Sequence, residues 1–200
     1  MEQALPQLTS RTAHVCVDMQ RLFSHDGPWS TPWLPKVVPQ CVALARHRPE
    51  ATIFTRFVTP VTADAAEGAW KEFYRRWPET TRARIDPALL ELVPELASFV
   101  PPALVFDKPV YSAFAGRKLV AHLHDRDVDT VILTGAETDV CVLSSALGAV
   151  DHGFHVVIAR DAVCSFSDAG HDALLDLFKQ RFSQQIFTAE TARVLEEWRE

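Results

Sequence analysis

Three side chains in this sequence could together hydrolyse a small molecule: Asp18, Lys108 and Cys141. Cys141 follows the apolar run 130-TVILTG-135 and stands where the next helix should begin, whereas a structural cysteine usually lies inside an element. A thiol attacks as its thiolate, and a helix N-terminus or a neighbouring lysine lowers a thiol's pKa. We therefore expect Lys108 to lower the pKa of Cys141, and Asp18 to carry the proton to a leaving amine.

The elements that must position these residues follow from the pattern of apolar residues. Short β-branched runs predict buried strands, and helix-like segments lie between them. This alternation predicts a six-stranded parallel sheet between two helical layers, a three-layer α/β/α fold, in a single domain over residues 1–200. The expected strands are 14–18, 52–58, 104–107, 130–135, 155–159 and 184–188, and the expected helices are 34–47, 86–93, 115–126, 139–152, 168–182 and 189–199.

The three polar residues stand at comparable places in this predicted sheet. Asp18 ends the first run, Lys108 ends the third, and Cys141 follows the fourth. Ligands of open α/β sheets bind beyond the carboxyl ends of the strands, so the three side chains should meet at one edge. Asp139 would oppose a thiolate if it approached the sulfur, so we expect it to point away or to cap the helix. Backbone amides of the same turn could cradle an oxyanion.

The remaining cysteines have ordinary settings. Cys16 lies in an apolar run, Cys41 in a predicted helix, and Cys164 after the next run. No two cysteines form a C-x-x-C pair, and their spacing fits no zinc pattern. Residues 1–13 lack the basic start and apolar core of a secretory signal, so we expect a cytoplasmic protein with reduced thiols.

The amino-acid composition and net charge limit the classes of partner that this protein could bind. The 200 residues are 48% hydrophobic and 23% charged, which is typical of a globular protein with a sizeable core. The net charge of −6 argues against nucleic acid and anionic membranes as partners. The apolar runs are far shorter than the roughly 18 residues of a membrane-spanning helix. We expect a small-molecule substrate, no nucleic acid and no membrane.

The segment 59–84 is irregular and too long for an ordinary connection, which predicts a lid, a pocket wall or a subunit contact. Aromatic residues and arginines, both enriched at interfaces, alternate in it. If Arg75 or Arg76 faces the pocket, the substrate should carry a carboxylate. A solvated or intersubunit arginine explains the sequence equally well. We expect a homodimer or homotetramer.

The segments DMQRLF, KPVYSAF and TGAETDVCV, in this order and spacing, resemble the isochorismatase-like cysteine hydrolases over roughly residues 12–190. The resemblance implies a catalytic triad of Asp18, Lys108 and Cys141 on a six-stranded parallel sheet with a Rossmann-like order. It also implies a cis peptide before Glu137, with the amides of Glu137 and Cys141 forming an oxyanion hole.

Three aromatic residues make up the expected substrate-binding set. Phe23 matches an aromatic position that often lines the pocket in this family. Trp70 comes from the irregular segment, and Tyr111 from KPVYSAF.

The metal ligands of one branch of this family are missing. Nicotinamidases of the family carry an Asp-x-His motif and further histidines after the second strand, where this chain reads TRFVTPVTADAAEGAW. The histidines elsewhere, such as His14, are best interpreted as core or surface residues. We expect no metal and no cofactor, and nicotinamidase activity is disfavoured.

These features favour a metal-independent amidohydrolase that cleaves a C–N bond of a small amide, ureido or carbamoyl compound through a Cys141 thioester. One alternative is an isochorismatase-type hydrolase of a vinyl ether, although some enzymes with that chemistry lack the cysteine. A second alternative is a non-catalytic, hydrolase-like binding subunit. The presence of all three triad residues argues against it. A thiol-redox role is weaker, because no second cysteine lies close in sequence to Cys141.

Overall fold

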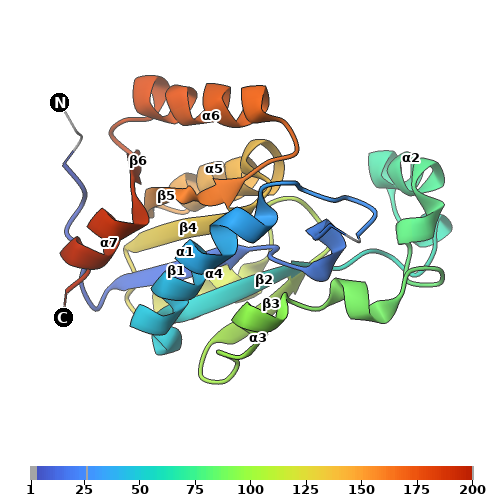
Figure 1. Cartoon of the computed structure of the whole chain (residues 1–200), viewed down its shortest axis with the longest axis horizontal. Helices are drawn as coiled ribbons and strands as arrows, with labels where there is room; N and C mark the ends of the chain where they lie inside the picture. The colour runs from blue at the N-terminus through green and yellow to red at the C-terminus, as the bar shows by residue number, and fades with distance from the viewer. Residues whose placement is uncertain (1–3, 26, 200) are drawn as a thin grey trace.

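Six parallel strands form one sheet in the order β3-β2-β1-β4-β5-β6 (Figure 1). This computed structural model describes residues 4–25 and 27–199, so residues 1–3, 26 and 200 of the predicted 1–200 domain lie outside it. The predicted three-layer α/β/α fold with a Rossmann-like strand order is confirmed. The strands are β1 (Thr12–Val17), β2 (Thr52–Phe57), β3 (Leu104–Lys108), β4 (Thr130–Ala136), β5 (His155–Cys164) and β6 (Ile186–Ala189).

Helices cover both faces of the sheet and bury two separate cores. One core contains Cys16, Phe54 and Ile132 from the strands, and α1, α3 and α7 contribute to it. The other contains Val15 and Leu133, and α4, α5 and α6 contribute to it. Alternate residues of each strand enter opposite cores, because side chains alternate across a strand. The helices are α1 (Leu34–His47), α2 (Gly68–Arg76), α3 (Pro94–Ala97), α4 (Arg117–Asp125), α5 (Leu143–Asp151), α6 (Asp168–Arg181) and α7 (Thr191–Glu197).

The predicted helix 86–93 is wrong in type and length. Asp86 does cap the segment, since its Oδ1 accepts a hydrogen bond of 2.9 Å from the amide of Ala88. The segment nevertheless forms only a short 3₁₀ turn, Pro87–Leu90. Pro94 restricts the residue before it to an extended conformation, and Val93 has ψ 143°. A helix therefore cannot continue through that point.

The segment 59–84 is more regular than expected, because it contains α2 and two short 3₁₀ turns. Figure 1 shows α2 beyond the carboxyl ends of the strands, standing apart from the two layers of helices that flank the sheet. None of the described helices is long and apolar enough to cross a membrane.

A close approach between β1 and β4 shapes the carboxyl edge of the sheet. Gly135 has φ 105°, and a Cβ at this position would collide with the carbonyl oxygen of Val17. Only glycine therefore lets β4 pass this closely beside the end of β1. The contact brings the residues that follow each strand, Asp18 and Glu137, to the same edge.

Candidate active site

Asp18 leaves β1 in a left-handed conformation with φ 49° and is fully buried. Thr55 of β2 holds it in two ways. The Thr55 hydroxyl donates a 2.7 Å hydrogen bond to Oδ1 of Asp18, and it accepts one of 3.2 Å from the amide of the same residue. Short polar residues tolerate the left-handed region better than bulky ones, so an aspartate suits this turn. Thr55 thereby sets the direction of the carboxylate.

Lys108 reaches Asp18 from the end of β3, across the intervening β2. Its Nζ lies 2.6 Å from Oδ2 of Asp18 and donates a 3.0 Å hydrogen bond to the carbonyl oxygen of Val110. The ammonium also lies 5.1 Å from the centre of the Phe57 ring. Lys108 is only 6% exposed, so each charge compensates the other in a site that water barely enters.

Cys141 lies in a single π-helical turn, Thr138–Val142, that joins β4 to α5. The helix expected over 139–152 therefore begins with this turn, in which the amide of Val142 donates a 3.0 Å hydrogen bond to the carbonyl oxygen of Glu137. Such turns are frequent at functional sites. The Cys141 side chain is buried beside Asp18 and Lys108, so the structure brings the three predicted residues together.

Lys108 acts to lower the pKa of Cys141, as expected, but the net shift of that pKa is in the opposite direction. Burial raises the pKa of Cys141 well above its ordinary value, and the Asp18 carboxylate raises it further. Lys108 acts in the opposite direction, but its charge is shared with Asp18 at 2.6 Å. The resting site therefore holds a neutral thiol beside a carboxylate that can accept its proton during attack.

Glu137 follows the end of β4, and the peptide bond between Ala136 and Glu137 is cis, as the resemblance implies. Its carboxylate accepts a 3.2 Å hydrogen bond from the amide of Phe166. Burial raises the pKa of Glu137, and repulsion from Asp139 adds to the effect. Asp139 itself is held by a 2.5 Å hydrogen bond from the Ser165 hydroxyl, and the carboxylate that acts on the thiol is that of Asp18.

An aromatic cavity of about 250 Å³ opens onto Cys141. Of the predicted substrate-binding residues, Phe23 and Tyr111 lie in its wall, but Trp70 does not. Trp70 packs behind Tyr111, with the two ring centres 4.6 Å apart. The described residues that line it are Phe23, Trp29, Phe57, Phe73, Trp77, Tyr111, Glu137, Val140 and Cys141.

Trp29 is one of the wall residues that the sequence analysis did not name, together with Phe57 and Val140. Its ring centre lies 6.1 Å from that of Phe23, 5.8 Å from that of Phe73 and 6.5 Å from that of Trp77. Trp29 thus joins the segment after β1 to α2 and its C-terminal flank. Trp29 could have been noticed in the sequence as a large aromatic residue within the polar stretch SHDGPWS, which contains glycine and proline. No strand or helix pattern in that stretch would bury it.

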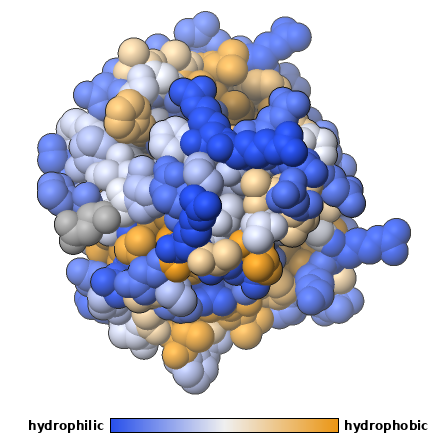
Figure 2. Space-filling model, turned by 90° about the vertical axis from the view of Figure 1, so that its right-hand side faces the viewer, coloured by the Kyte–Doolittle hydropathy of each residue, from blue (hydrophilic) through white to orange (hydrophobic). Residues whose placement is uncertain are grey.

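Neither of the arginines considered for carboxylate recognition lines the aromatic cavity. Arg75 lies 3.5 Å from Asp64 and is 61% exposed. The Arg76 guanidinium lies 5.9 Å from the centre of the Trp77 ring. Figure 2 faces this end of the molecule, where hydrophobic patches lie between strongly hydrophilic side chains.

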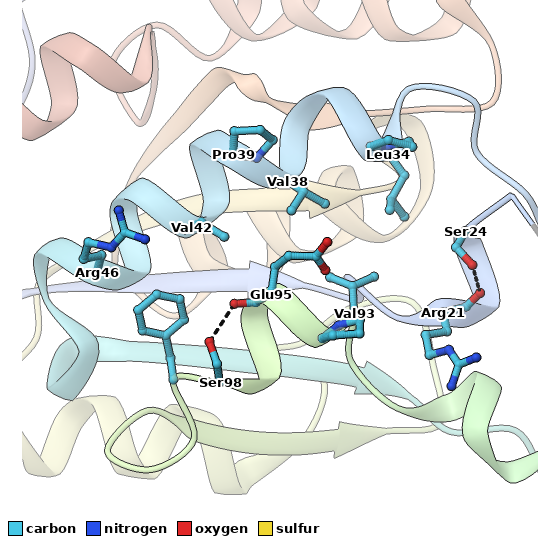
Figure 3. A pocket seen from close by; sticks show the side chains of 13 residues that line it. Arg21, Ser24, Leu34, Val38, Pro39, Val42, Arg46, Val93, Glu95 and Ser98 are labelled. Atoms are coloured by element: carbon cyan, nitrogen blue, oxygen red, sulfur yellow. Dashed lines mark hydrogen bonds between the residues drawn. The ribbon is translucent and has the colours of Figure 1, made fainter.

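A larger groove of about 700 Å³ lies between α1 and α3 and contains none of the three predicted catalytic residues. In Figure 3, Val38 and Val42 of α1 face Glu95 of α3 and Ser98, which follows that helix, across the groove, and Arg46 lies towards one end. Among the described residues, no group of three or more His, Cys, Asp or Glu side chains is arranged to hold a metal ion.

Comparison with known proteins places the chain in a family. A sequence model of the isochorismatase domain matches residues 12–190. The chain belongs to the isochorismatase family. Maleamate amidohydrolase of Pseudomonas putida is 29% identical over 171 residues, which cover 82% of this chain and 78% of the relative. The Bacillus subtilis isochorismatase family protein PncA is 37% identical over 86 residues, so the match spans 43% of this chain and 47% of that protein.

A solved structure supports the fold over almost the whole chain. The cysteine hydrolase of Pseudomonas syringae pv. phaseolicola 1448A superposes with a TM-score of 0.85 at 24% identity, covering 99% of this chain and 97% of that one. The present chain therefore has the α/β fold of this structural neighbour.

Proposed function

We propose that this isochorismatase-family protein is a cysteine amidohydrolase that cleaves a C–N bond of a small amide, ureido or carbamoyl compound. The observation that carries the proposal is the position of the buried Asp18 carboxylate, which contacts Lys108 and adjoins the Cys141 thiol at the carboxyl edge of the sheet. A nucleophile, a proton carrier and a cation thereby meet, and the nucleophile Cys141 lies in the wall of the aromatic cavity.

The chemistry follows from the neutral thiol. Asp18 takes the proton of Cys141 as Sγ attacks the carbonyl carbon, and Lys108 balances the negative charge. The backbone amides of Glu137 and Cys141 stabilise the oxyanion. Asp18 then protonates the leaving nitrogen, the C–N bond breaks, and an amine and a thioester result. Water hydrolyses the thioester, which releases a carboxylic acid and restores the thiol.

The lining of the aromatic cavity indicates that the part of the substrate held near Cys141 is an uncharged, largely apolar acyl group. Six of the nine described residues that line it are aromatic, and none of these nine is a lysine, arginine or histidine. Glu137 would repel a carboxylate in the same space. Its volume of about 250 Å³ suits a small molecule. The amidohydrolase name of the Pseudomonas putida relative supports the amide class, although that protein's name specifies maleamate.

The direct test is turnover of a panel of small amides, with a vinyl ether included. The wild-type protein should release an amine or ammonia from an uncharged amide, and Cys141→Ala should abolish this turnover while the protein remains folded. Asp18→Asn should lower kcat far more than it raises KM, because the proton carrier is lost.

Cys164→Ala is the matched control, since Cys164 is also a buried thiol but lies in the wall of a different cavity. This variant should keep wild-type turnover. Release of product by Cys141→Ala at the wild-type rate would overturn the proposal, and so would hydrolysis of the vinyl ether alone.

A further inference from the structure

The segment 165–171, which leaves β5 and enters α6, lies beside the turn that carries Cys141. β4 and β5 pair up to their last residues, with Ala136 opposite Cys164. Because the two strands are parallel, the residues that follow them emerge at the same edge of the sheet. The segment takes no part in the chemical steps proposed above, yet its residues bind three consecutive side chains of the turn.

Two carboxylates of the turn are bound by this segment. Oδ1 of Asp139 accepts the 2.5 Å hydrogen bond from the Ser165 hydroxyl. Oε1 of Glu137 accepts one of 3.2 Å from the amide of Phe166. Oδ2 of Asp139 lies against the backbone of Gly170, since a Cβ at this glycine would be only 2.7 Å from that oxygen. Both carboxylate oxygens of Asp139 therefore contact the segment.

The residue between these two carboxylates, Thr138, is held by a histidine of the same segment. Oγ1 of Thr138 and Nδ1 of His171 are hydrogen-bonded at 2.9 Å, and Thr138 is fully buried. The segment is itself fixed by a helix cap, because the Ser167 hydroxyl accepts a 3.2 Å hydrogen bond from the amide of Gly170. Three consecutive side chains of the turn are thus bound to one capped segment.

The backbone of this turn carries the two amides that the proposed function uses to stabilise the oxyanion, those of Glu137 and Cys141. Such donors are effective because they already point to the place where negative charge develops. A misplacement of about 1 Å can lower a rate roughly 100-fold. Side chains that fix the backbone between residues 137 and 141 should therefore affect the rate of attack without touching the substrate.

We propose that Ser165 and His171 are positioning residues, which hold the oxyanion-stabilising amides in place through Asp139 and Thr138. The inference rests on the proposed function. In this role neither residue exchanges a proton with the substrate. Both act on the first chemical step through the geometry of the turn.

Acylation by 4-nitrophenyl benzoate tests this role, because attack of Sγ on the ester carbonyl forms an oxyanion before 4-nitrophenolate is released as a burst. Alkylation of Cys141 by iodoacetamide is the reference reaction, since displacement of iodide at a saturated carbon forms no oxyanion. Ser165→Ala and His171→Leu should each slow the burst about tenfold, because the amides lose their fixed geometry. The alkylation rate at the same pH should stay within about twofold of wild type.

Two further variants exclude a merely structural role. His171→Asn should bring the burst rate back to within about threefold of wild type, because a side-chain amide can donate or accept a hydrogen bond. Gly170→Ala should slow the burst, since the new Cβ displaces the Asp139 carboxylate. This variant should not lower the melting temperature, because alanine favours a helix more than glycine does.

His152→Leu is the matched control. This histidine also makes a hydrogen bond, of 3.2 Å to the carbonyl oxygen of Phe114, but it follows the opposite end of α5 from the turn. The variant should keep the wild-type burst rate. If it slowed the burst as much as His171→Leu, the effect would come from general loosening of the fold, and the positioning role would be wrong.

The outcomes separate this inference from the proposed function. Burst rates within twofold of wild type in both Ser165→Ala and His171→Leu overturn the positioning role, and so does an equal slowing of the burst and of alkylation. Either result leaves the cysteine mechanism standing. A wild-type protein in which mass spectrometry finds no benzoyl-Cys141, or a burst that persists in Cys141→Ala, overturns the proposed function and this inference with it.

Discussion

The carboxylate of Asp18 and the ammonium of Lys108 lie 2.6 Å apart across the end of β2, almost out of contact with solvent. This contact links the ends of β1 and β3, two strands that are not neighbours in the sheet. Burial is the main cause of the raised pKa of Cys141, and within this ion pair Asp18 raises that pKa further while Lys108 lowers it.

The first prediction concerns the pH dependence of Cys141 alkylation. Because the pKa of Cys141 is raised, its reaction with iodoacetamide should be slow near neutral pH and should increase beyond the ordinary thiol range near pH 8.5. Asp18→Asn should shift this profile to lower pH, since a charge that disfavours the thiolate is removed. Lys108→Met should shift it to higher pH. Rates measured by peptide mapping over a pH series test these shifts, and a wild-type midpoint below pH 7 would contradict them.

The second concerns the charge of the substrate. Glu137 is the carboxylate in the wall of the aromatic cavity, so the enzyme should prefer benzamide to 4-carboxybenzamide. Glu137→Gln should raise kcat/KM for the anionic amide about tenfold, roughly 1.4 kcal/mol, with a much smaller effect on benzamide. Because the pKa of Glu137 is raised, the wild-type enzyme should discriminate less at low pH, where this carboxyl is protonated.

A matched control for that experiment is Glu72→Gln, which removes an exposed carboxylate from α2 outside the cavity wall. If this variant relaxed the preference as much as Glu137→Gln, the effect would come from the general charge of the molecule. The local role of Glu137 would then be wrong.

The third concerns metal dependence. The proposed mechanism assigns the nucleophile, proton carrier and positive charge to Cys141, Asp18 and Lys108, so turnover should survive exhaustive chelation. Elemental analysis of the active protein should show far less than one zinc or iron per chain. About one metal per chain, with activity lost on its removal and restored on its return, would refute metal independence.

The fourth concerns acid stability and His14, which is fully buried in β1. Its ring nitrogens lie 2.9 Å from the Thr134 hydroxyl and 3.3 Å from the Thr52 hydroxyl, and burial lowers its pKa from 6.5 to about 3. A lowered folded-state pKa contributes stability that is fully present above pH 6.5 and is lost as the pH falls towards 3. Over this range the contribution of His14 should fall by about 1.4 kcal/mol per pH unit.

His14→Gln isolates this contribution from that of the carboxylates, which titrate in both proteins. The free energy of unfolding should be measured by urea titration between pH 7 and pH 4. The advantage of the wild type over the variant should shrink as the pH falls, and parallel pH profiles would show that His14 does not carry this proton linkage.

The sequence alone determined the sheet and the residues at its edge. Strands buried on both faces need nearly continuous apolar, β-branched runs, so the predicted runs coincide closely with β1, β2 and β4. The edge strand β3 is only partly buried, and its shorter apolar run also marks it closely. Polar residues directly after such runs emerge at one edge because parallel strands all end there. This local pattern was sufficient to predict that Asp18, Lys108 and Cys141 lie close together.

Only the tertiary structure decided the environment of these residues, because it depends on groups far apart in the chain. The pKa of Cys141 is raised by burial and by Asp18, a residue 123 positions away, and no local pattern reports either effect. The aromatic cavity likewise contains Trp29 from before α1 and Phe73 from α2, while Trp70, on the same helix as Phe73, lines a different cavity together with Lys108. Periodicity specifies which side chains share a helix, but the packing of that helix decides what each side chain faces.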